Sequence, residues 1–120
     1  MTEKDIRSGL RTGELSRERA LLLVEAELAL AESASLWNLR GDLIPLAESP
    51  RALEDARSSY EHAILLAPDD PEAYESLGHF YDAVEPHWEL ARQFYMQALG
   101  RGAGEACRLA LMQLLEEHEK

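Results

Sequence analysis

Residues 71–99 read PEAYESLGHFYDAVEPHWELARQFYMQAL and contain two helix-length segments, 71–84 and 86–99. Each segment begins with a proline that directly follows an acidic residue, Asp70 or Glu85. An acceptor side chain followed by proline is typical of a helix start, because the first helical position has no use for the missing N–H. The short connection between the two segments predicts an antiparallel helix pair.

The second of these segments carries small residues around one large ring. Ala91 and Ala98 flank Tyr95, so a neighbouring backbone can approach closely while the ring fills the gap. In the first segment Gly78 stands in mid-helix, where glycine costs about 1 kcal/mol relative to alanine. That cost indicates a close crossing by the partner helix.

An earlier part of the chain holds a second copy of this pattern. Matching residues stand 35 positions before Trp88, Ala91, Tyr95 and Ala98, namely Leu53, Ala56, Tyr60 and Ala63. Trp37 and Gly41 precede Tyr74 and Gly78 by 37 positions. Self-similarity at a fixed period is the signature of a repeat architecture, in which neighbouring units bury a shared core.

The remaining segments are also predicted to be helical. They cover residues 3–10, 17–33, 35–47, 50–67 and 103–117. Gly9 and Gly13 are expected to end the first of them, Ser16 to cap the second, and Ser49-Pro50 to begin the fourth. No stretch shows the period-2 alternation of a strand, so the sequence predicts an all-α protein.

Together these residues resemble the tetratricopeptide repeat, with about two copies over residues 34–104. The later copy matches through Tyr74, Leu77, Gly78, Tyr81, Trp88, Ala91, Tyr95, Ala98 and Leu99. The earlier copy has Arg40 where leucine is usual and Ile44 where tyrosine is usual. Pro45 is expected to kink its first helix or cut it short.

The resemblance implies antiparallel helix pairs stacked as a short right-handed solenoid with flanking helices. We expect one domain over residues 1–120, with N-terminal helices in 1–33, repeats in 34–70 and 71–102, and a capping helix in 103–120. In this family the first helix of each pair lines a groove. The matching positions are Asn38 and Asp42 in the first copy and Glu75, His79 and Asp82 in the second.

Charge narrows the class of partner. The chain has 12 Lys and Arg against 23 Asp and Glu, a net charge of −11. This balance argues against nucleic acid and anionic membranes and favours a basic or neutral polypeptide. The most apolar run, 20–24, is too short for a secretory core or a membrane span, so a cytoplasmic location is expected.

No catalytic, metal or cofactor motif stands out. The sequence lacks HExxH, CxxC, GxSxG and a phosphate-binding loop. Cys107 is the only cysteine and lies among apolar residues, so we expect it to be buried and structural. His79, Asp82, Glu85 and His87 show no ligand closing from another helix, and His62 and His118 are expected to be solvated. The sequence therefore indicates a non-catalytic interaction module or scaffold, with the alternative that its groove acids form only a solvated face.

The segment 17–33 offers a second surface. Leu21, Leu22 and Leu28 are expected on one apolar face, with Glu18, Glu25 and Glu32 as the solvent stripe. A helix this apolar packs on two neighbours, forms a homodimer seam, or holds an apolar client in the manner of a chaperone. The sequence leaves these three alternatives open.

Overall fold

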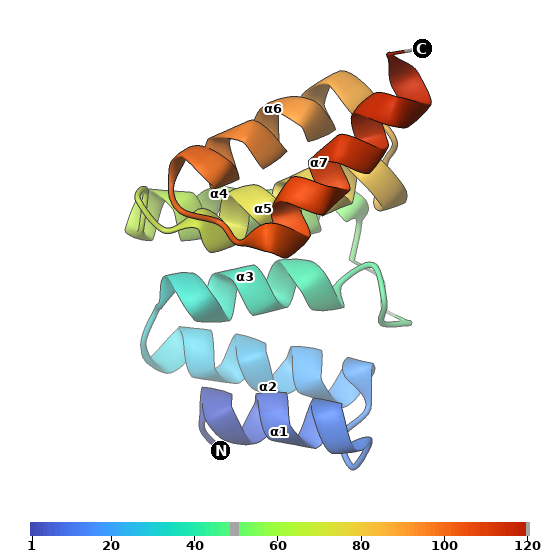
Figure 1. Cartoon of the computed structure of the whole chain (residues 1–120). Helices are drawn as coiled ribbons and strands as arrows, with labels where there is room; N and C mark the ends of the chain where they lie inside the picture. Colours follow the sequence, from blue (N-terminus) through green and yellow to red (C-terminus); the bar gives the residue numbers. More distant parts are fainter. Residues whose placement is uncertain (49–50, 120) are drawn as a thin grey trace. The chain divides into compact units, whose positions relative to one another are not determined.

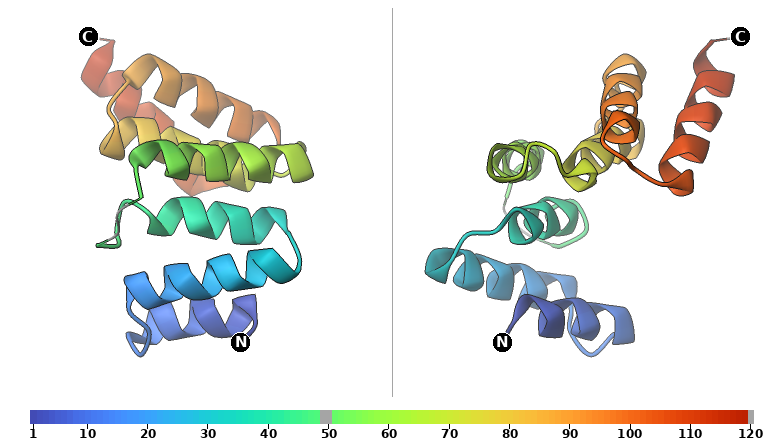
Figure 2. Two further views of the ribbon diagram at one scale, coloured as in Figure 1. Left: turned by 180° about the vertical axis from the view of Figure 1, so that it is seen from behind. Right: turned by 60° about the vertical axis from the view of Figure 1, so that its left-hand side comes forward.

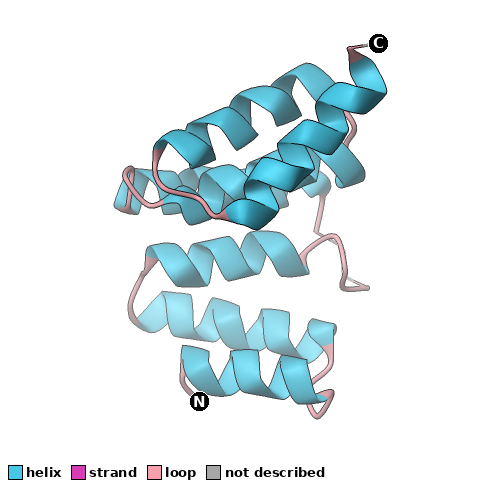
Figure 3. Cartoon of the chain, in the orientation of Figure 1, coloured by secondary structure: helices cyan, strands magenta, loops and turns pink. Residues whose placement is uncertain are grey.

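The structure is a computed structural model that describes residues 1–48 and 51–119. The regular elements of these residues are all helical (Figures 1 and 3), which confirms the all-α prediction. In chain order they are α1 (Glu3–Thr12), α2 (Arg17–Leu30), α3 (Ala34–Leu43), α4 (Leu53–Leu66), α5 (Pro71–His79), the π-helical turn η1 (Phe80–Val84), α6 (Trp88–Gly100) and α7 (Glu105–His118). The chain forms two compact units, unit 1 (Met1–Leu66) and unit 2 (Ala67–Lys120).

In unit 1, α2 packs between α1 and α3, and α3 pairs with α4 (Figures 1 and 2). Ser16 caps α2 as predicted, because its hydroxyl accepts the Arg19 N–H at 3.2 Å. Gly13, with φ of 82°, ends α1 as expected. Gly9 does not end the helix. It lies inside α1, where an added Cβ would stand 2.9 Å from Cβ of Leu15, so its role is close packing against the returning chain.

Three helix boundaries in unit 1 can be compared with the prediction. α2 stops at Leu30 because Ser33 already caps α3, accepting the Leu36 N–H at 3.0 Å. α3 ends at Leu43, so the helix before Pro45 is cut short as expected. α4 begins at Leu53, and the Ser49-Pro50 start signal lies outside the described residues.

A polar network joins three helices of unit 1 around Arg40. The guanidinium donates to Glu25 Oε2 on α2 at 3.1 Å and to Ser59 Oγ on α4 at 2.7 Å. Ser59 is fully buried and donates in turn to the carbonyl of Asp55 at 2.8 Å. Arg51 adds a second bond to Glu25 at 2.8 Å. Glu25 therefore holds two cations and fixes α2 against the helices beside it.

We expect Glu25→Gln to destabilise unit 1 by about 1–2 kcal/mol at neutral pH, because both arginines lose their charged acceptor. Burial raises the pKa of Glu25, but hydrogen bonds and ion pairs with Arg51 and Arg40 outweigh it, so the net pKa is lowered. A lowered folded-state pKa contributes stability above the unfolded value of about 4.3, and that stability is lost as pH falls through the folded value. The variant should therefore lose less stability than the wild type on acidification.

Urea unfolding followed by circular dichroism at several pH values below about 6 measures this difference. Glu14→Gln is the matched control, since it removes the same charge from an exposed position of unit 1. Identical acid profiles for the wild type and Glu25→Gln would contradict the network's role.

In unit 2, α6 packs against both α5 and α7. Asp70 caps α5 as predicted, accepting the Glu72 N–H at 2.9 Å with Pro71 in the first turn. The predicted start at Glu85-Pro86 is wrong. α6 begins at Trp88, and Nδ1 of His87 accepts the Leu90 N–H at 3.3 Å.

The shifted start of α6 follows from the π-helical turn η1. The Glu85 N–H donates to the Phe80 carbonyl at 2.9 Å, and the His87 N–H donates to the Tyr81 carbonyl at 2.8 Å. These hydrogen bonds span five and six residues. They place Glu85 and Pro86, which were expected to start the next helix, in the turn before it. A π-helical turn is often found at functional sites, because it re-aims side chains that an α-helix would space differently.

One ring fills the centre of unit 2. Tyr95 is fully buried, and a Cβ added to Gly78 would lie 2.4 Å from its ring. Gly41 and Tyr60 make the same kind of contact in unit 1, at 2.5 Å. Both mid-helix glycines therefore allow the close approach that their positions predicted.

The helices of the described residues are short compared with a lipid bilayer. The longest have 14 residues, and none is both long and apolar enough to cross a membrane.

Candidate functional site

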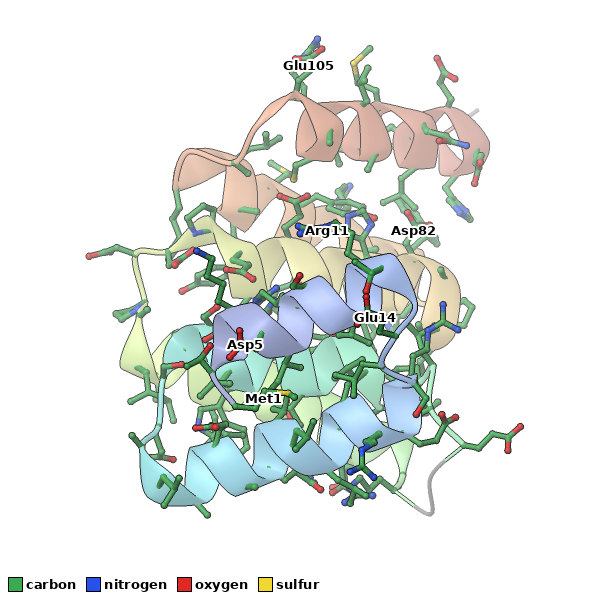
Figure 4. The ribbon with its side chains drawn as sticks, turned by 90° about the horizontal axis from the view of Figure 1, so that it is seen from below. Met1, Asp5, Arg11, Glu14, Asp82 and Glu105 are labelled. Carbon is green, nitrogen blue, oxygen red and sulfur yellow. The ribbon has the colours of Figure 1, made fainter. Side chains whose placement is uncertain are left out.

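Three side chains that the sequence analysis singled out lie along one line of unit 2. Glu75 and His79 stand one turn apart on α5, with Glu75 Oε2 3.6 Å from His79 Nε2. Asp82 follows on η1 and is labelled in Figure 4. Oη of Tyr95 donates to Asp82 Oδ2 at 2.8 Å and lies 2.9 Å from Nδ1 of His79. We call Glu75, His79 and Asp82 the acidic row.

The buried hydroxyl of Tyr95 links two members of the acidic row, His79 and Asp82. Burial, and then its hydrogen bond to the Asp82 carboxylate, raises the pKa of Tyr95 well above the ordinary value, so the hydroxyl keeps its proton. With that proton directed at Asp82, His79 Nδ1 is placed to donate to the hydroxyl oxygen. The part of the row that lies on α5 stays accessible, since the side chains of His79 and Glu75 are 55% and 30% exposed. The arrangement presents two carboxylates to a cation, Asp82 held by the Tyr95 hydroxyl and Glu75 beside His79.

The positions expected to extend this surface in unit 1 serve the interior instead. Asn38 is only 2% exposed, so the expectation that it faces a groove is wrong. It lies on α3, which is covered by α2 and α4. Asp42 is half-buried and accepts the Tyr60 hydroxyl at 2.7 Å. Burial and this carboxylate raise the pKa of Tyr60, as happens at Tyr95.

The apolar helix α2 is turned differently from the prediction. Leu21 is 1% exposed and belongs to the core, Leu28 is half-buried, and Leu22 is 60% exposed, so the three do not share one face. Glu25, expected in the solvent stripe, instead binds Arg40 and Arg51. The accessible apolar stripe consists of Leu22, Ala26, Ala29 and Leu30.

Glu18 is exposed as predicted and also accepts the backbone N–H of Glu48 at 2.9 Å. That bond lowers the pKa of Glu18. Glu32 is exposed as predicted and accepts the Trp37 indole N–H at 3.1 Å. Glu18, Glu25 and Glu32 therefore all accept hydrogen bonds from other residues of unit 1.

The other reactive side chains have packing roles. Cys107 is fully buried, as expected, and burial raises the pKa of its thiol to about 11, which keeps it protonated and unreactive at neutral pH. His62 stacks on Trp37 at 4.4 Å, and His118 stacks on Trp88 at 5.2 Å between ring centroids. Both histidines are exposed, but the sequence did not indicate these ring contacts. In the part of the chain that the structure describes, no three ligating side chains gather as a metal site.

A pocket beside the acidic row was not foreseen from the sequence. It has a volume of about 360 Å³ and lies wholly in unit 2. Residues of η1, α6 and α7 form its wall, including Tyr81, Asp82, Trp88, Leu114 and His118. Residues this far apart in sequence give no local signal.

Comparison with protein-family models, with curated proteins and with solved structures gave no match. What the acidic row does is therefore argued from its own residues.

Proposed function

We propose that this protein is a non-catalytic interaction module that binds a basic segment of another polypeptide along the acidic row. The observation that carries this proposal is the anchoring of Asp82 and His79 by one buried hydroxyl while Glu75 and His79 remain accessible. Fixed carboxylates bind a cation at little ordering cost. The net charge of −11 favours the same partner over an acidic one.

A tetratricopeptide-like solenoid is the architecture we propose for this module. Each helix pair, α3 with α4 and α5 with α6, packs a glycine under a tyrosine ring. Arg40, the departure from the repeat pattern, has its own partners in Glu25 and Ser59. A cytoplasmic location belongs to the same proposal, supported by a free, buried Cys107 that needs no oxidising compartment.

Glu75→Lys is expected to weaken binding of a labelled peptide of alternating lysine and serine about tenfold, because it replaces one of the two carboxylates of the acidic row with a cation. Fluorescence anisotropy at about 50 and 300 mM salt measures the affinity and how far salt weakens it by screening the charges. Charge reversal at Glu75 is preferable to reversal at Asp82, which would also remove the acceptor of Tyr95.

Asp69→Lys is the matched control, since it makes the same charge change at an exposed position of unit 2. It should alter the affinity by less than about twofold, as expected for a surface charge outside the recognition row. If both variants weaken binding equally, the attraction is to net charge alone and the acidic row is not the binding site.

A second candidate function rests on the apolar stripe of α2. Leu22 and Leu30 are 60% and 81% exposed and lie about two turns apart on one side of α2, with the exposed Ala26 and Ala29 between them. An apolar client or a second copy of the chain would cover it.

A further inference from the structure

We infer that the pocket beside Asp82 takes an alkylammonium group, supplied by a lysine side chain of the bound segment. The inference rests on the proposed function, because the pocket shares Asp82 with the acidic row. Its volume of about 360 Å³ lies at the small end of ligand sites, which suits one side chain better than a large cofactor.

The charge of the pocket favours a cation. Among the described lining residues Asp82 is the only acid, none is Lys or Arg, and the basic side chains are those of His87 and His118. The Tyr95 hydroxyl occupies one acceptor position of Oδ2, and a carboxylate offers about four such positions in all. Asp82 therefore remains able to accept from an ammonium group, in an orientation already fixed by Tyr95.

The walls suit the methylene stem of lysine. Leu114 and Tyr81 are buried and supply apolar surface. Trp88 is half-buried and stacks on His118 with an interplanar angle of 1°. The Arg92 guanidinium carbon also lies 5.4 Å from the ring centroid, and Arg92 is itself paired with Glu119 Oε1 at 3.1 Å, so Trp88 serves as a wall of the pocket and the cation is left to Asp82.

The same geometry disfavours arginine. Arginine binds a carboxylate best through two parallel hydrogen bonds to both oxygens. One acceptor position of Oδ2 is taken by Tyr95, so arginine has fewer orientations in which it can pair with both oxygens. Lysine is a point charge with three donors and needs only one oxygen, so we expect the pocket to select lysine over arginine.

The test uses Trp88 as its reporter. The chain has two tryptophans, so Trp37→Phe leaves Trp88 as the sole tryptophan, whose emission is followed with excitation on the red edge, where tyrosine does not absorb. The full-length variant is titrated with n-butylammonium, and with peptides of alternating serine and either lysine or arginine. The titrations are made at about pH 8, where histidine side chains are ordinarily uncharged. We expect a saturable change in Trp88 emission with n-butylammonium and with the lysine peptide, and an arginine peptide at least about threefold weaker in that signal.

Asp82→Asn is the decisive variant, because its amide oxygen still accepts from Tyr95 while the charge is gone. Asp82→Asn should weaken the affinity for n-butylammonium, measured from Trp88 emission, about tenfold. Asp69→Asn should leave that affinity unchanged. Thermal unfolding of Asp82→Asn verifies that unit 2 remains folded.

The two proposals fail in different ways. If the lysine and arginine peptides bind equally by anisotropy and Trp88 does not respond, the pocket inference is wrong and the acidic row keeps its function. If neither peptide binds but n-butylammonium changes Trp88 emission in an Asp82-dependent manner, the pocket is an ammonium site and the segment-binding function is wrong. An n-butylammonium response that survives Asp82→Asn overturns the pocket inference.

Discussion

Gly78→Ala is expected to destabilise unit 2 by about 3 kcal/mol, even though alanine is the better helix former by about 1 kcal/mol. The new Cβ would lie 2.4 Å from Cδ1 of Tyr95, a distance at which atoms must move. Tyr95 is fully buried, so its ring has no free space to enter. Displacing that ring also moves the hydroxyl that holds Asp82 and His79, and binding along the acidic row should weaken together with stability.

Urea and thermal unfolding of the full chain measure this loss, and Gly100→Ala is its control. Gly100 is the last residue of α6, and an added Cβ there meets nothing within 4 Å. Gly100→Ala should therefore be neutral or stabilising by up to about 1 kcal/mol.

A double-mutant cycle assigns the cost to the ring. In a Tyr95→Leu background, Gly78→Ala should cost at least about 1 kcal/mol less than it does in the wild type, because the two residues are in contact. Additive effects of the two substitutions would show that the destabilisation has another source.

The glycine contact is one of the features that local sequence could predict. A glycine in mid-helix is costly by itself, so Gly41 and Gly78 indicated close packing before any partner was known. Ser16 and Asp70 cap their helices as predicted, because a cap is formed by residues only two or three positions apart. Cys107 is buried as its apolar neighbours indicated.

Features that depend on distant residues were missed. The orientation of α2 is decided by Arg40 and Arg51, which attract Glu25 inward, and periodicity alone cannot choose between two sides of a helix that is apolar nearly all round. The cap at His87 depends on the π-helical turn before it, which no local residue pattern announced.

The candidate site was predicted only in part. Glu75, His79 and Asp82 were predicted because they match the groove positions that the resemblance to the tetratricopeptide repeat implies, and the structure brings them close together. Asn38 has a matching position in the resembled repeat, but it is buried. Tyr95 and the pocket wall come from other helices, so only the folded chain brings them to Asp82.

Leu21→Asp is expected to abolish folding of unit 1, with a loss of about 4 kcal/mol or more, because it buries an unpaired carboxylate in the core. Leu21 is 1% exposed and lies on the side of α2 that faces its neighbours. Leu22→Asp, one position along the same helix, should change the stability by less than about 1 kcal/mol because that side chain is 60% exposed. Circular dichroism and urea unfolding of the two variants compare them directly.

The pair tests both the orientation of α2 and the second candidate function. Consecutive helical residues point about 100° apart, so the reverse result, an unfolded Leu22→Asp and a folded Leu21→Asp, would mean that α2 presents the opposite side to the core. With the orientation as described, Leu22→Asp becomes the folded probe of the apolar stripe. If the wild type is dimeric by light scattering and Leu22→Asp is monomeric, the stripe joins two copies of the chain. If the wild type is monomeric and binds an apolar peptide that Leu22→Asp does not bind, the stripe holds a client. Equal behaviour of the two proteins in both measurements leaves the acidic row as the only proposed binding surface, because a carboxylate at the centre of a desolvated apolar contact would weaken it strongly.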